Sequence, residues 1–208
     1  MPTRITQIEA FILAGGASSR MGTDKSQLLL GGQTFVERIA VTLQTVTDTI
    51  RLVGGSANSK FPTVADVYPQ WGALGGLHAA LTACRREWAI VVACDLPFVT
   101  AELFRSLASH RGDHDAPHDA PHDAIVPMQP DGRPQPLAAL YRVDPCARRA
   151  TELIEAGRRR PLDLLQSVNT RWVDFAEIAN LDQAETFFVN INTPDDYYGV
   201  VRVPNTDR

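Results

Sequence analysis

The chain has 208 residues, of which 44% are hydrophobic and 21% charged, a composition typical of a single globular domain spanning residues 1–208. Its formal net charge of −4 argues against nucleic-acid or anionic-membrane partners, and no apolar run reaches the ~20 residues of a membrane helix. The start lacks signal-peptide features and the three cysteines form no C-x-x-C pair, so we expect a cytoplasmic protein without disulfides.

The first predicted element is a buried strand at residues 8–13, followed by the loop A-G-G-A-S-S-R-M-G-T-D-K at residues 14–25. Glycines let backbone N–H groups approach an anion closely, and Arg20 and Lys25 add the positive charge that suits a triphosphate. The loop fits neither the dinucleotide fingerprint nor the P-loop spacing. We therefore predict a nucleotide-binding loop of another kind; a plain surface turn is the alternative.

A βαβ unit follows the loop. Thr34 and Glu37 form a predicted capping box before a helix with apolar positions as far as Val46. Residues 50–53 then read as a second strand. This order predicts a doubly wound α/β fold with a mostly parallel sheet.

A short strand at residues 63–65 delivers Asp66 to its carboxyl end, where open α/β sheets bind ligands. A single Asp after a strand is also a common turn former, so both interpretations stay open. The glycine-rich segment G-A-L-G-G-L at residues 72–77 opens the next helix, and its N–H groups are accessible to an anion or a base edge.

The most clearly buried strand spans residues 88–93 and ends at Asp95, in C-D-L-P-F. We expect the Asp95 carboxylate at the same edge as the opening loop, where it could hold Mg²⁺ bridged to triphosphate oxygens. The alternative is a helix cap, but Thr100 already serves that purpose before the next helix.

Residues 112–123 contain a repeated D-A-P-H and few apolar side chains. Its histidines could chelate a metal in principle, but the prolines prevent a helix that would align them. We predict a low-complexity surface loop inserted between a helix ending near His110 and a strand at residues 124–126.

The last third of the chain predicts a strand ending at Tyr141, a helix capped by Asp144, and the run Arg158-Arg159-Arg160. Tyr141 is expected to pack rather than react. The arginine run reads as a solvated face, with phosphate binding by bidentate hydrogen bonds as the alternative.

Near the end, F-V-N-I-N-T-P-D-D places Asn190 and Asn192 on one face of a predicted strand end. Thr193 and Pro194 then begin a helix.

The motif L-A-G-G-x-x-x-R-M-G-x-D-K, starting at Leu13, resembles the signature of the molybdenum cofactor guanylyltransferases (MobA), within the MobA-like nucleotidyltransferases. G-A-L-G-G, C-D-L-P-F, Q-P-L-A-A-L-Y and N-I-N-T-P are similar to further motifs of this group. These matches are distributed along the chain from residue 13 to residue 196. Ala73 is a departure, because the family has proline there.

The resemblance implies a three-layer, Rossmann-like nucleotidyltransferase domain that uses Mg²⁺. The domain would move GMP from GTP to the molybdopterin-bound molybdenum cofactor, which gives the guanine dinucleotide form and pyrophosphate. It implies catalytic roles for Lys25 and Arg20, a metal-binding role for Asp95, and an acceptor-side position for Asn190 and Asn192. The nucleotide-binding residues that it implies are Leu13, Ala14, Gly15, Gly16, Lys25, Asp66, Gly76 and Asp95. Molybdoenzyme chaperones or upstream cofactor-synthesis proteins are the expected protein partners.

Two alternatives remain open from the sequence. The first is a sibling enzyme, a CTP-dependent molybdopterin cytidylyltransferase or a sugar-phosphate nucleotidyltransferase. The second is a non-catalytic nucleotide-binding adaptor. Retention of Lys25, Asp66 and Asp95 together argues against the adaptor.

Overall fold

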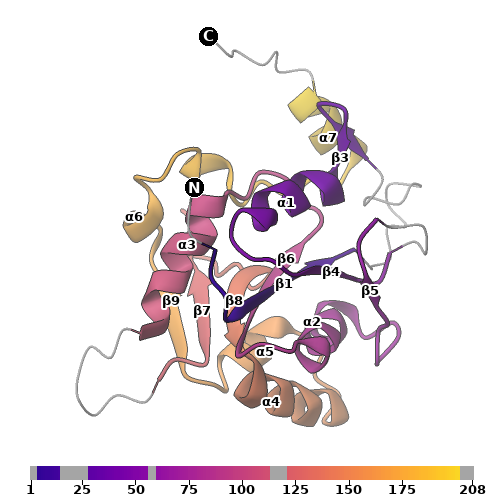
Figure 1. Ribbon diagram of the computed structural model, residues 1–208, viewed down its shortest axis with the longest axis vertical. Coiled ribbons are helices and arrows are strands. Elements are labelled where there is room, and N and C mark those ends of the chain that lie inside the picture. Colours follow the sequence, from indigo (N-terminus) through magenta and orange to yellow (C-terminus); the bar gives the residue numbers. More distant parts are fainter. Residues whose placement is uncertain (1–3, 15–27, 56–59, 113–120, 202–208) are drawn as a thin grey trace.

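A seven-stranded sheet forms the centre of the computed structural model, which describes residues 4–14, 28–55, 60–112 and 121–201 (Figure 1). The strand order is β5-β4-β1-β6-β8-β7-β9. Only β8 runs against its neighbours β6 and β7, and the remaining pairs are parallel. The strands are β1 (Ile8–Leu13), β4 (Ile50–Val53), β5 (Thr63–Val64), β6 (Trp88–Ala93), β7 (Ala124–Pro127), β8 (Ala138–Arg142) and β9 (Thr170–Val173).

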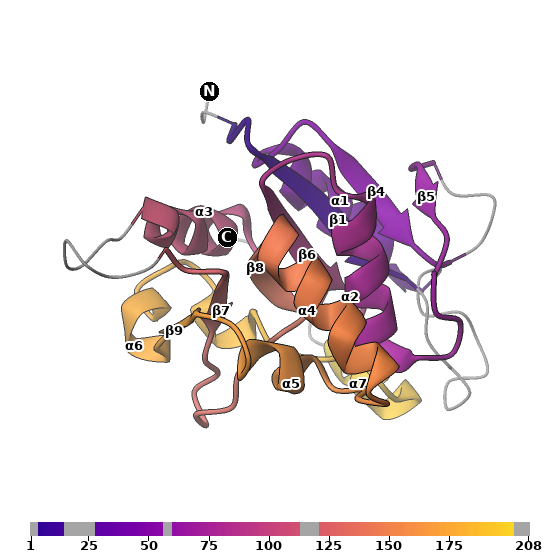
Figure 2. The same cartoon turned by 90° about the horizontal axis from the view of Figure 1, so that it is seen from below.

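Helices cover both faces of the sheet, as Figures 1 and 2 show from two directions. One buried cluster includes residues of α1 (Phe35–Gln44), α3 (Ala101–Ser109) and α6 (Phe175–Ile178). The cluster on the other face includes residues of α2 (Gly72–Ala83), α4 (Val143–Glu155) and α5 (Pro161–Leu165). The predicted three-layer α/β class is confirmed. None of the helices in the described ranges is both long enough and apolar enough to cross a membrane.

The helices α1 and α3 begin at their predicted caps, Thr34 and Thr100. The Thr34 hydroxyl accepts from the Glu37 N–H at 3.1 Å, and the Glu37 carboxylate accepts from the Thr34 N–H at 3.0 Å. A hydrogen bond from Lys60, followed by those from Thr34, lowers the pKa of Glu37 to about 2. The Thr100 hydroxyl caps α3 by accepting from the Leu103 N–H at 3.3 Å.

Three local predictions were wrong. Helix α4 begins at Val143 and its N-cap is Arg142, so Asp144 lies inside the first turn. The Val143 N–H donates to the Glu87 carbonyl and so places the helix start directly after β8. Residues 190–192 form no strand, because the Ile191 N–H bonds to a loop carbonyl rather than to a ladder. The strand predicted at residues 63–65 ends at Val64.

The hairpin of β2 (Leu29–Leu30) and β3 (Gln33–Thr34) was not predicted. Gly31 and Gly32 both have positive φ, at 59° and 81°, as a two-residue hairpin turn of this kind requires. A 3₁₀ turn at 110–112 follows α3, and another at 184–186 precedes the last helix, α7 (Pro194–Val201).

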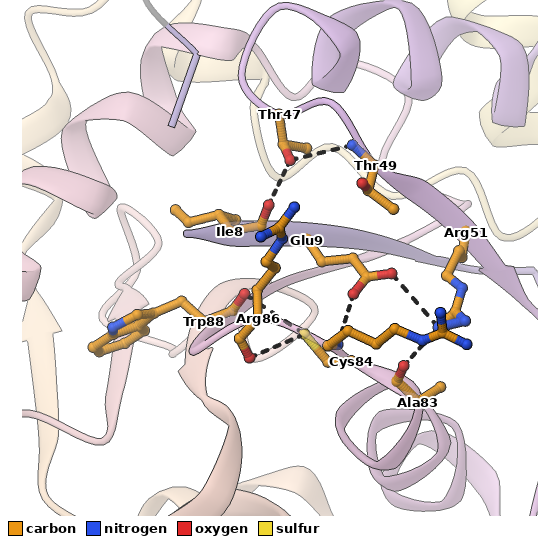
Figure 3. Close-up of polar contacts among 10 residues, drawn as sticks. Ile8, Glu9, Thr47, Thr49, Arg51, Ala83, Cys84, Arg86 and Trp88 are labelled. Carbon is orange, nitrogen blue, oxygen red and sulfur yellow. Dashed lines mark hydrogen bonds and ion pairs between the residues drawn. The ribbon is translucent and has the colours of Figure 1, made fainter. Parts of the chain in front are cut away.

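A buried ionic network fixes the far end of α2 (Figure 3). Glu9, 2% exposed on β1, lies 3.5 Å from the Arg51 guanidinium and accepts from the Arg85 N–H at 2.8 Å. Arg51 also donates to the Ala83 carbonyl at the last residue of α2, at 2.6 Å. The carboxylate and guanidinium therefore satisfy backbone groups at the end of this helix, which holds it against β1 and β4.

Candidate active site

The predicted site begins where β1 ends, at the carboxyl edge of the sheet. The Cys94 N–H donates to the Leu13 carbonyl at 3.0 Å, and the Ala14 N–H donates to the Val53 carbonyl at 2.9 Å. Gly55 approaches so closely that a Cβ on it would lie 3.1 Å from the Ala14 Cβ. The residue from which the glycine-rich loop departs is therefore held between the ends of three strands.

The first turn of α2 packs directly on this point. A Cβ at Gly76 would lie 3.5 Å from the Leu13 side chain, which is ordinary contact. A Cβ at Gly75 would lie only 2.8 Å from the Trp71 Cβ and 3.6 Å from the Asp66 carboxylate. Glycine at position 75 lets the helix start lie against the segment that carries Asp66.

Asp66 lies in the turn between β5 and α2, and its Oδ1 accepts from the Tyr68 N–H at 3.1 Å. Its side chain is partly exposed. The turn-forming interpretation is thus part of the geometry, and it holds the carboxylate beside the helix start. Its contact with nucleotide stays a prediction.

Asp95 follows β6 at the same edge and is partly exposed. The segment 94–98 is fixed from several sides: Arg38 of α1 donates to the Pro97 carbonyl at 3.0 Å and lies over the Phe98 ring. Since Thr100 caps α3, Asp95 is not the cap of that helix. Within the described ranges, no three His, Cys, Asp or Glu side chains gather to hold a metal. A single carboxylate fits Mg²⁺ that takes its other oxygens from phosphates and water.

The asparagine motif lies beside Asp95. The Ile191 N–H donates to the Asp95 carbonyl at 3.0 Å, and Ile191 is fully buried between the more exposed Asn190 and Asn192. The predicted alternation is therefore present without a strand. Asp196 accepts from the Thr193 N–H at 2.8 Å and donates its own N–H to the Thr193 hydroxyl, so Thr193 caps α7.

The structure thus brings Leu13, Ala14, Asp66, Gly76, Asp95, Asn190 and Asn192 to one edge of the sheet. The predicted residues Gly15, Gly16, Arg20 and Lys25 lie outside the described residues.

Sequence reasoning missed an aromatic cluster at the start of α2. The Tyr68 ring meets His78 edge-on at 5.0 Å between centroids and lies 6.4 Å from the Trp71 ring. Trp71 in turn contacts Arg158 and Arg159, which are 87 and 88 residues further along the chain. No local pattern predicts this contact. The one available signal was the position of Trp71, an aromatic residue directly before the glycine-rich start of α2.

The thiols of Cys84 and Cys146 are unsuited to nucleophilic chemistry. Burial raises the pKa of Cys84 to about 12, and burial also raises the pKa of Cys146. Neither is a thiolate near neutral pH, the form that attacks an electrophile. The edge of the sheet instead offers carboxylates, amides and helix N–H groups, which suit binding and orientation of a phosphate-bearing substrate.

Comparison with known proteins identifies the group. A model of the MobA-like NTP transferase domain matches residues 10–170. The chain belongs to the MobA-like NTP transferase family. The chain is 32% identical over 211 residues to the molybdenum cofactor guanylyltransferase of Vibrio parahaemolyticus, covering 92% of this chain and 93% of that protein.

Solved structures agree with this membership. The molybdopterin-guanine dinucleotide biosynthesis protein A of Archaeoglobus fulgidus superposes with a TM-score of 0.74 at 25% identity, covering 92% of this chain and 96% of that one. A 2-C-methyl-D-erythritol 4-phosphate cytidylyltransferase of Thermus thermophilus, at 17% identity and a TM-score of 0.62, shares the fold alone. This MobA-like chain is therefore a nucleotidyltransferase.

Proposed function

We propose that this protein is a molybdenum cofactor guanylyltransferase, which moves GMP from GTP to the molybdopterin cofactor and releases pyrophosphate. The observation that carries the proposal is the gathering of Asp66, Gly76, Asp95 and the Asn190–Asn192 motif at one sheet edge. The names of relatives at about 30% identity over most of the chain favour guanylyl over cytidylyl transfer.

The chemistry is an in-line displacement. A terminal phosphate oxygen of the acceptor forms a bond to the α-phosphorus of GTP, while the bond from that phosphorus to the bridging oxygen breaks and pyrophosphate leaves. No protein nucleophile is needed, so the protein contributes orientation and neutralisation of charge. Lys25 and Arg20 would neutralise the triphosphate, and Asp95 would hold the metal. Bound Mg²⁺ would supply a further positive charge to the phosphate oxygens.

The donor is tested first by thermal unfolding with GTP, CTP, ATP and UTP, each with and without Mg²⁺. A ligand at 100 times its Kd stabilises the fold by about 2.7 kcal/mol, which raises the midpoint by several degrees. A Mg²⁺-dependent rise with GTP alone supports guanylyl transfer. A rise with CTP alone would move the assignment to the cytidylyl enzyme.

The reaction is tested by pyrophosphate release with GTP and the molybdopterin cofactor. We expect Asp95→Asn to lower turnover by about 10²-fold or more, because the anionic carboxylate that would hold Mg²⁺ against the phosphates is lost. Asp48→Asn is the matched control, since Asp48 is exposed and pairs with Arg4, away from the site residues. Turnover of Asp95→Asn close to that of the wild type would exclude the metal-binding role. No transfer by the wild type would favour the adaptor.

A further inference from the structure

The three arginines of the 158–160 run are not equivalent in the structure. The Arg158 guanidinium forms two hydrogen bonds with Asp163, at 3.0 and 2.7 Å, and is committed to that ion pair. Its backbone carbonyl accepts from the Trp71 indole N–H at 3.0 Å. The Arg159 guanidinium lies over the Trp71 ring, 4.3 Å from its centroid. A single indole therefore holds two consecutive residues of this run.

Trp71 is itself fixed by the helix that it precedes. The backbone N–H of Trp71 donates to the Tyr68 carbonyl at 3.1 Å, and the absence of a Cβ on Gly75 makes room for the Trp71 side chain. Tyr68 in turn donates its N–H to Asp66. One continuous set of contacts thus runs from the Asp66 carboxylate through Trp71 to Arg159.

The loop that carries Arg159 is fixed from its other side too. Gly157 takes a φ of 78° at the end of α4, and the Arg158 N–H donates to the Leu153 carbonyl at 2.8 Å. Arg159 is exposed, and no carboxylate pairs with it within the described ranges. Its guanidinium is therefore oriented by an aromatic face while its N–H groups remain available for an anion.

We propose that Trp71 is a positioning residue for the second substrate: its indole orients Arg159 beside the start of α2, where the guanidinium meets the acceptor's terminal phosphate. A phosphate monoester suits the planar fork of an arginine. The donor's triphosphate has its own expected cations, Arg20 and Lys25, on a different segment. This inference rests on the proposed guanylyl transfer.

The test is a double-mutant cycle on guanylyl transfer, with kcat/KM for the molybdopterin acceptor and Kd for GTP–Mg²⁺ measured separately. We expect Arg159→Ala to lower the acceptor kcat/KM by about 10-fold or more. Trp71→Leu should lower it roughly 3- to 10-fold. The double variant should match Arg159→Ala within about 2-fold, because Trp71 acts through Arg159. The Kd for GTP–Mg²⁺ should stay within about 2-fold throughout.

Two further variants keep the test decisive. Trp71→Phe keeps an aromatic face but loses the N–H donor, so it should fall between wild type and Trp71→Leu. If Trp71→Leu fails to fold, the cycle is run with Trp71→Phe. Arg149→Ala removes an exposed arginine of α4 and should leave the acceptor kcat/KM unchanged.

Multiplicative losses in the double variant would overturn the inference, as would a GTP Kd that weakens as much as the acceptor kcat/KM falls. An active wild type with an unaffected Trp71→Leu would overturn it while leaving guanylyl transfer intact. A wild type without any transfer would overturn the proposed function itself.

Discussion

His78 is a buried titratable side chain between the two helices that flank the proposed site. Its Nε2 lies 3.0 Å from the Thr151 hydroxyl, which already donates to the Ala147 carbonyl. The Thr82 hydroxyl lies 3.4 Å from the same nitrogen, whereas Nδ1 is buried without a partner among the described residues. Burial lowers the pKa of His78 below its ordinary 6.5, although the Asp66 charge opposes the shift.

This geometry predicts sensitivity to acid. The unfolded chain protonates His78 at a higher pH than the folded chain does. The contribution of the neutral imidazole to the free energy of unfolding is therefore complete above pH 6.5 and declines as the pH falls below it. We expect a lower free energy of unfolding at pH 5.5 than at pH 7.5, measured by urea denaturation. In His78→Gln, which does not titrate, this pH difference should shrink. An unchanged difference would assign the acid sensitivity to other groups.

Lys25 carries the proposed charge contact to the triphosphate. We expect Lys25→Ala to reduce turnover by about 10²-fold or more, because a transition-state charge contact is lost. Steady-state pyrophosphate release measures this, with Lys60→Ala as a control because Lys60 is exposed and pairs with Glu37. Near-normal turnover of Lys25→Ala would rule out its catalytic role.

At the scale of an element, the Glu9 network determines where α2 ends. We expect Glu9→Ala to lower the free energy of unfolding by about 3 kcal/mol, since it leaves the largely buried Arg51 guanidinium without the carboxylate that balances its charge. Glu9→Gln should cost less, because an amide oxygen can still accept from the Arg85 N–H. Urea midpoints at an unchanged m value would measure both.

Glu87 provides the matched comparison for Glu9. Its ion pair with Arg142 is 3.6 Å long and both side chains are substantially exposed. Glu87→Ala should therefore change the stability by less than about 1 kcal/mol. Equal losses at Glu9 and Glu87 would show that burial does not strengthen the network.

Elements with strong local signals were predicted from the sequence. The bounds of β1, β4 and β6 follow from unbroken or nearly unbroken apolar runs, and the caps Thr34 and Thr100 from side chains that bond their own helix. Edge strand β9 was missed because its residues are mostly half-exposed and give no buried run. Local sequence patterns do not report hydrogen bonds between distant segments. For this reason the start of α4 was predicted at the wrong residue, and a strand was predicted at residues 190–192 where none forms.

The same limit applies to the candidate site. Asp66 and Asp95 could be expected at one edge because parallel strands share a carboxyl end. The contact of Trp71 with Arg159 joins segments 88 residues apart, and its pairing depends on how α2 and α4 pack. No spacing rule predicts that contact.

At the scale of the whole molecule, the repeat inside residues 112–123 stays predicted to be an insertion that the fold tolerates. The flanking elements end at Gly112 and resume at β7. We expect deletion of Asp115–His118, one copy of the repeat, to change stability by less than about 0.6 kcal/mol, because loop-closure cost varies slowly with length. The melting midpoint should move by no more than about 2 °C.

A deletion of similar length elsewhere gives the contrast. Removing residues 130–133 would destroy the turn between the bridged Met128 and Pro134, where Asp131 and Arg133 form an ion pair. We expect a larger drop in melting midpoint than for Asp115–His118. A drop of the same size from the repeat deletion would contradict its assignment as an insertion.

The hydrogen bond from the Ile191 N–H to the Asp95 carbonyl has a consequence for folding during synthesis on the ribosome. All seven strands of the central sheet have been translated once the ribosome passes Val173, whereas Ile191 has not. A nascent chain can therefore assemble its sheet before the edge that carries the proposed site is complete. Premature termination between Val173 and Ile191 would yield a polypeptide with every strand of the sheet but an incomplete edge at the proposed site.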